Sequence, residues 1–122
     1  MESFYGVEQN SFIEVRSGSS WRQEFIWIQK TNNQPVDLTG CRAVFKMVRS
    51  RTNTTVLEDD SNDSPTNLTI DELNGKVIFS IDEEYTRTLK PGVYKADLKV
   101  IFSDGSDRAT DIFQIRVKEG LS

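Results

Sequence analysis

The residue types that perform proton transfer and nucleophilic attack are scarce in this chain of 122 residues. Histidine is absent, so the chain lacks an imidazole base, a Ser-His-Asp or Cys-His nucleophile pair, and a histidine-bearing zinc site. Its one cysteine, Cys41, has no histidine to activate it and cannot close an internal disulfide. We therefore interpret Cys41 as a small buried hydrophobic residue.

Carboxylates are the remaining chemical resource, with nineteen Asp and Glu residues against fifteen Lys and Arg. The spacing Asp59-x-Ser61-x-Asp63 opens like a calcium loop, but Ser64 stands where that loop needs glycine and Ile70 where it needs a bidentate glutamate. A glycosidase needs only two carboxylates, yet nothing in a chain of this size indicates the deep cleft that would hold a sugar. We predict a non-enzymatic protein with no metal and no cofactor.

Length and charge restrict the partners and the domain count. A chain of 122 residues matches the usual size of one domain. The net charge of −4 opposes the phosphate attraction that drives nucleic-acid binding. No apolar run approaches the ~20 residues of a membrane helix. We expect one domain, with neither a nucleic acid nor a membrane as its partner.

The elements that would position these residues are strands, because apolar residues recur at every second position and helical periodicity is almost absent. The clearest alternation lies in residues 41–49, 77–81, 93–102 and 113–117. Asp82 precedes two more acids and predicts a single helical turn over residues 82–86, with Asp82 as its N-cap. Seven or eight short strands with one helical turn predict an all-β, antiparallel β-sandwich.

Two polar stretches are interpreted as connections. Residues 50–67 are the most polar part of the chain and predict a mobile loop around a short strand at residues 55–57. Asn74-Gly75 predicts a tight hairpin turn with positive φ at both positions, and Asp104-Gly105 predicts a second hairpin.

We predict that the chain consists of three segments. Residues 1–12 carry Phe4 and Tyr5 without a clean strand pattern, so we expect an arm or edge segment that packs on a neighbouring subunit. Residues 13–119 form the sandwich, and residues 120–122 are a tail. Residues 25–28 are apolar at every position, which is typical of a central core strand or of a strand with one face against another chain.

Two short motifs have structural explanations. Leu89-x-x-Gly92-x-Tyr94 matches a tyrosine corner, in which the phenol hydroxyl binds the upstream backbone and the ring fills the edge of the core. Asp37 is expected to accept backbone N–H groups in a connection that ends at Gly40, where a positive φ is expected.

Three segments together resemble a known family: residues 35–40 between two strands, residues 74–77 leading into the acidic turn, and residues 89–98. The chain is similar, over roughly residues 20–118, to the small immunoglobulin-like domains of phage and prophage tail proteins. Such domains occur as free proteins and at the N-terminus of upper-baseplate and receptor-binding proteins. The resemblance implies an immunoglobulin-like fold.

The resemblance also implies a non-enzymatic structural protein of the virion, assembled in the host cytoplasm as part of a tail, baseplate or connector. Its partners would be other virion proteins and further copies of itself. The candidate interface residues are Phe4, Tyr5, Trp21 and Trp27. A carbohydrate- or receptor-binding module, in which Trp21, Trp27 or a loop aromatic stacks on a sugar, is the alternative, together with a head decoration protein.

Overall fold

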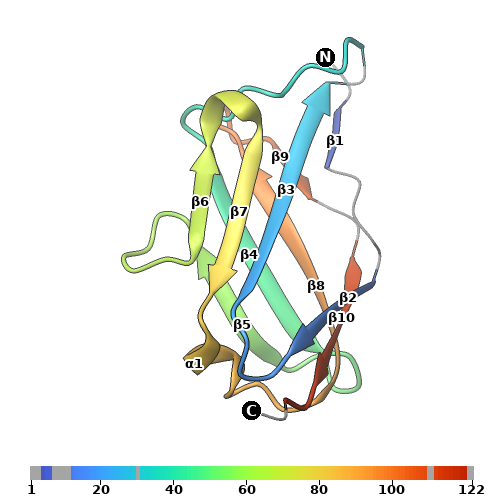
Figure 1. Cartoon of the computed structure of the whole chain (residues 1–122). Coiled ribbons are helices and arrows are strands. Elements are labelled where there is room, and N and C mark those ends of the chain that lie inside the picture. Colours follow the sequence, from blue (N-terminus) through green and yellow to red (C-terminus); the bar gives the residue numbers. More distant parts are fainter. Residues whose placement is uncertain (1–3, 7–11, 30, 110–111, 121–122) are drawn as a thin grey trace.

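The computed structural model describes residues 4–6, 12–29, 31–109 and 112–120, with residues 4–6 and 12 described through their backbone alone. Two sheets pack face to face (Figure 1). The first contains, in spatial order, β1 (Phe4–Gly6), β3 (Trp21–Gln29), β7 (Lys76–Ile81) and β6 (Leu68–Asp71). The second contains β2 (Phe12–Arg16), β10 (Phe113–Lys118), β8 (Gly92–Ile101), β4 (Arg42–Arg49) and β5 (Thr55–Asp60), and β9 (Asp107–Ala109) also pairs with β8.

This strand order is that of an immunoglobulin-like sandwich, which confirms the predicted all-β fold class. In that fold the first, second, fifth and fourth strands form one sheet, and the third, sixth and seventh form the other. Here β1, β3, β7 and β6 make the first set, and β4, β8 and β10 the second, with β5 added beside β4. The described strands number ten instead of seven or eight, because β1 and β2 divide the first strand and β9 and β10 divide the last. One pair, β2 with β10, is parallel rather than antiparallel.

The core lies between the sheets and is built from the inward-facing residue of each strand alternation. Phe79 of β7 and Phe45 of β4 stack across the interior, with ring centroids 4.2 Å apart. The ring of Trp21 meets both of them edge-on, and Phe25 of β3 approaches Phe113 of β10 at 5.7 Å. Burying an aromatic side chain of this size stabilises the fold by about 2 kcal/mol. The aromatic cluster therefore holds the two sheets together.

The polar stretch at residues 50–67 contains the short strand predicted at residues 55–57, but this strand continues to Asp60, further than predicted. β5 is a six-residue strand paired with β4, so only residues 50–54 and 61–67 are connections. Its inward-facing positions are Leu57 and Asp59, both buried. Because a carboxylate stands where alternation leads one to expect an apolar residue, this strand has the sequence of a loop.

The two predicted hairpins also differ in detail. Asn74 does not have positive φ: it ends the 3₁₀ turn η1 (Glu72–Asn74), and Gly75 alone is left-handed, with φ 65°. The second hairpin is present, with β9 antiparallel to β8 beyond Gly105. The final strand, however, resumes only at β10, further down β8.

The helical turn is present as α1 (Glu83–Thr86), and Asp82 caps it by accepting a 3.0 Å hydrogen bond from the Tyr85 N–H. Thr86 is fully buried. Its hydroxyl donates to the Ser19 carbonyl at 2.8 Å and accepts from the Gly18 N–H at 3.0 Å. This hydroxyl therefore ties α1 to the turn between β2 and β3.

Candidate functional site

The tyrosine corner is confirmed at the junction between α1 and β8. The Tyr94 side chain is 1% exposed, and its hydroxyl donates a 2.5 Å hydrogen bond to the Lys90 carbonyl. Leu89 is buried beside it, and Gly92 has φ 151°, a conformation that favours glycine. The Arg49 guanidinium lies 5.4 Å from the centre of the Tyr94 ring. The motif thus performs a structural task and presents no group to a ligand.

The connection at residues 37–40 is also as predicted. Asp37 Oδ1 accepts hydrogen bonds from the Thr39 N–H at 2.9 Å and the Thr39 hydroxyl at 2.6 Å. These bonds lower the pKa of the Asp37 carboxyl, the hydroxyl contributing most. Gly40 has φ 76° and donates its N–H to Glu72 Oε2 at 3.3 Å. The connection is therefore linked to η1 at the same end of the sandwich.

The expectation that Trp21 and Trp27 form an interface is wrong. Trp21 is 6% exposed and Trp27 is fully buried, so neither ring is available to another chain or to a sugar. The reason is the alternation of side chains along β3: Trp21, Phe25 and Trp27 are separated by even numbers of positions, so they lie on the same inner face. Residues 25–28 lack a polar outer face because Ile26 and Ile28 lie on it, half-buried. Both indole N–H groups are buried without a hydrogen-bond partner among the described residues.

Phe4 and Tyr5 are placed by their backbone. They pair antiparallel with Gln29 and Ile28, so β1 is an edge strand of the chain's own first sheet. The positions of their side chains, and residues 1–3 and 7–11 of the expected N-terminal arm, lie outside the described part of the chain. Their role as interface residues stays a prediction.

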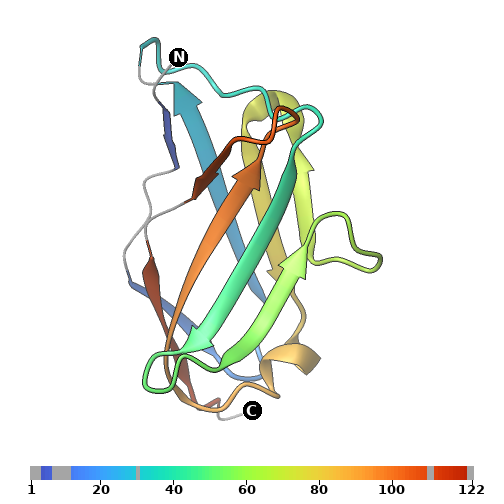
Figure 2. The ribbon, with the colours of Figure 1, turned by 180° about the vertical axis from the view of Figure 1, so that it is seen from behind.

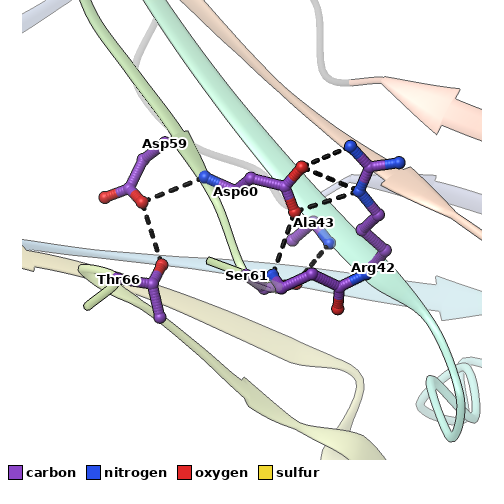
Figure 3. Close-up of polar contacts among 7 residues, drawn as sticks. Arg42, Ala43, Asp59, Asp60, Ser61 and Thr66 are labelled. Carbon is purple, nitrogen blue, oxygen red and sulfur yellow. Dashed lines mark hydrogen bonds and ion pairs between the residues drawn. The ribbon is translucent and has the colours of Figure 1, made fainter. Parts of the chain in front are cut away.

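Asp59, the first acid of the failed calcium match, and its neighbour Asp60 both form hydrogen bonds or ion pairs within the fold (Figure 3). Asp59 accepts from the Asp60 N–H and the Thr66 hydroxyl through Oδ1, at 3.0 and 2.9 Å, and from the Asn67 N–H through Oδ2 at 3.0 Å. Asp60 pairs with the Arg42 guanidinium, which is the main cause of the lowered pKa of its carboxyl. Among the described residues, no group of three or more metal-binding side chains is arranged around a cation site.

Cys41 is half-buried at the loop end of β4. Burial is the first cause that raises the pKa of its thiol, and the negative charges of Asp37, Glu72 and Asp104 raise it further. A thiol held in its neutral form is a poor nucleophile.

Three large apolar side chains are well exposed among the described residues, and sequence reasoning had singled out none of them. Leu73 is 76% exposed, Ile112 66% and Val93 39%. Leu73 lies in η1, whereas Ile112 and Val93 lie on or beside the outer face of the second sheet. The sequence signal for an exposed apolar residue was the position of Leu73 inside a polar turn and of Ile112 immediately before the alternating residues 113–117.

A shallow hollow of about 140 Å³ lies on that outer face, over the paired strands β4 and β8. Its lining consists of Lys46, Val48, Lys95, Ala96, Asp97 and Ile112. Within the described part of the chain, neither Lys46 nor Lys95 forms an ion pair. The hollow therefore combines an apolar floor with lysines that have no anionic partner among those residues.

The sequence matches no protein-family model and no curated protein. Among solved structures, the titin Ig tandem domains A164-A165 are similar, with a TM-score of 0.47 and 14% sequence identity. The similarity covers 93% of this chain and 46% of the titin tandem, so the chain spans about half the length of that structure. Within the described residues, no helix has the length and apolar character needed to cross a membrane.

Proposed function

We propose that this protein is a non-enzymatic structural component of a phage virion, in the tail, baseplate or connector, and that it acts through protein–protein contacts. The observation that supports this function is that the three segments that resemble phage tail proteins each form a structural connection of the sandwich. Asp37 and Gly40 build one connection, Gly75 the next, and Gly92 and Tyr94 the corner. Each segment maintains the sandwich, so the exposed surface remains available for contacts.

The residue types that could take part in catalysis are engaged in structural contacts or are held in an unreactive form. Asp59 and Asp60 are occupied by a loop and a guanidinium, and the neutral form of the Cys41 thiol is favoured. Histidine is absent from the whole sequence. A structural role requires none of these groups to be reactive.

The carbohydrate-binding alternative requires Trp21, Trp27 or a loop aromatic to stack on a sugar, and both tryptophan rings are buried. Of the aromatic side chains whose exposure is described, the most accessible are the half-buried Tyr85 and Phe102. A sugar-stacking platform needs a broad exposed ring. Protein–protein contact is therefore the better explanation of the surface.

Quantitative mass spectrometry of purified virions tests the proposal. We expect the intact chain in a fixed copy number relative to known tail proteins, and we expect its gene to lie among structural genes. Metabolic neighbouring genes, together with virions that lack the chain, would overturn the proposal. Reproducible glycan-array binding by the wild-type protein would favour the carbohydrate-binding alternative instead.

A further inference from the structure

The hollow over β4 and β8 has the size and chemistry of a receptor for one aliphatic side chain. Its volume of about 140 Å³ is close to that of the ~150 Å³ apolar cavity that accommodates a benzene molecule. Val48 and the highly exposed Ile112 contribute apolar surface to its lining. Figure 2 views the molecule from the side on which β4, β5 and β8 lie in front.

The charge around the hollow favours an acidic partner. Lys46 and Lys95 line it and have no ion pair in the part of the chain that the structure describes. Asp97 is the one acid in the lining, and it lies opposite Lys46 in the strand register without coming within ion-pair distance. Two lysines against one aspartate make the lining positive, and a further acid, Glu58, lies opposite Lys46 on the β5 side, outside the lining.

The same chain also has an exposed apolar side chain at one end of the sandwich, and the residues around it carry negative charge. Leu73 is the most exposed large apolar residue described, at the connection between β6 and β7 (Figure 1). Its neighbour Glu72 is exposed, and Asp37 and Asp104 are exposed on the adjacent connections. The Leu73 tip, defined as Leu73 with these three acids, is therefore an aliphatic side chain in an acidic surrounding.

We propose that the Leu73 tip of one copy docks into the β4–β8 hollow of a second copy. Leu73 fills the hollow, and the acids of the tip face Lys46 and Lys95. This inference rests on the proposed function, since it names the contact by which copies assemble. The two surfaces are different parts of the molecule, so the contact is head-to-side, and a pair of copies keeps one free tip and one free hollow. Such contacts build rings or open chains.

A second copy fits better than an unrelated partner, because both halves of the contact are present in one sequence. The apolar residues match in character, and the charges match in sign. Docking removes two exposed aliphatic side chains, Leu73 and Ile112, from water at once.

Complementation between two variants tests the proposal. Leu73→Asp disables the tip, and Ile112→Asp disables the hollow; Ser80→Asp, exposed on the opposite sheet, is the matched control. In sedimentation velocity over a concentration series, wild type and Ser80→Asp should associate, and each tip or hollow variant alone should associate at least about tenfold more weakly. An equimolar mixture of Leu73→Asp and Ile112→Asp should recover a heterodimer, because an intact tip then meets an intact hollow. If Ile112→Asp does not fold, Lys95→Glu replaces it.

The remaining outcomes overturn the inference. A wild-type protein that stays monomeric up to millimolar concentration excludes the contact. Association that Leu73→Asp leaves unchanged, or a mixture that fails to form heterodimers, places the interface elsewhere. Both results are distinguishable from failure of the proposed function, which depends on the presence of the chain in virions and not on this contact.

Discussion

Tyr94 and Lys90 are joined across the corner that leads into β8, where the phenol hydroxyl donates a 2.5 Å hydrogen bond to the Lys90 carbonyl oxygen. The Tyr94 ring is buried below this bond, and Arg49 lies over the ring. The contact fixes the path from α1 into the longest strand, and that strand carries one wall of the hollow. The corner therefore lies on the same strand as part of the lining of the candidate interface.

Removing the hydroxyl should weaken the corner without creating a large cavity. We expect Tyr94→Phe to lower the free energy of unfolding by about 1–2 kcal/mol, because a partly buried carbonyl loses its donor. Urea denaturation followed by circular dichroism measures this change. Tyr85→Phe is the control, since that half-buried side chain makes no comparable hydrogen bond to a described residue, and its effect should stay within about 0.5 kcal/mol. Equal losses in the two variants would contradict the role given to the corner.

Asp59 should be the most important carboxylate for the connection between β5 and β6. Its two oxygens accept from the Asp60 N–H, the Thr66 hydroxyl and the Asn67 N–H. We expect Asp59→Ala to cost about 2–3 kcal/mol, because these donors lose their acceptor in a partly buried site. Amide hydrogen exchange should also accelerate at Asn67. Asp63→Ala, at an exposed acid in the same connection, should change neither measurement, and a similar effect of both substitutions would refute the assignment.

Most of the fold could be predicted from strand alternation, because a strand with one buried face has an apolar residue at every second position. Residues 77–81 and 93–102 were predicted as strands on that basis, and every second residue of each as far as Val100, Phe79 and Tyr94 among them, is buried. The start of β5 was predicted, but its extension to Asp60 was not. The inward Asp59 accepts hydrogen bonds from Thr66 and Asn67, which are seven and eight residues away and therefore not visible in a local pattern. Turn chemistry failed at Asn74 for a similar reason, since the dipeptide does not encode the preceding 3₁₀ turn.

The surface was less predictable than the core. Aromatic content directed attention to Trp21 and Trp27, yet large aromatic residues within strands are usually core residues, and both of these are. The hollow joins Lys46 and Val48 of β4 with Lys95 of β8 and Ile112 near β10, and only the pairing of these strands brings them together. A single sequence contains no signal for that convergence.

The pairing of Asp60 with Arg42 should make stability depend on pH in the acid range. The guanidinium lowers the pKa of the folded-state carboxyl below its usual value near 4, so the unfolded chain binds the proton more readily. The contribution is therefore present above about pH 4 and is lost as the pH falls through the lowered folded-state value.

We expect Asp60→Asn to be less stable than wild type at pH 7 by less than about 1 kcal/mol, since the pair is partly exposed. Below pH 4 the difference between the two proteins should shrink. Urea titrations at pH 7, 5 and 3 measure it, and 0.5 M salt should reduce it at pH 7. A difference that grows on acidification would mean that the ion pair does not control the titration of Asp60.

Gly75 should tolerate substitution less than any other glycine in a turn, because it combines a positive φ with a close backbone approach. A Cβ atom at Gly75 would lie 2.6 Å from the Trp27 carbonyl oxygen and 3.0 Å from that of Val36. Gly105 shares the positive φ, at 91°, but a Cβ atom there meets nothing within 4 Å. Comparing alanine at the two positions separates the cost of the dihedral angle from the cost of the clash.

We expect Gly105→Ala to lower the free energy of unfolding by about 1–2 kcal/mol, the cost of a left-handed residue with a side chain. Gly75→Ala should exceed that loss by at least about 1 kcal/mol, because the backbone around Trp27 and Val36 must shift. Thermal unfolding monitored by tryptophan fluorescence suits the test, since Trp27 reports directly on the disturbed strand. If both variants lost the same stability, the close approach at Gly75 would have no energetic weight, and φ alone would explain the glycine.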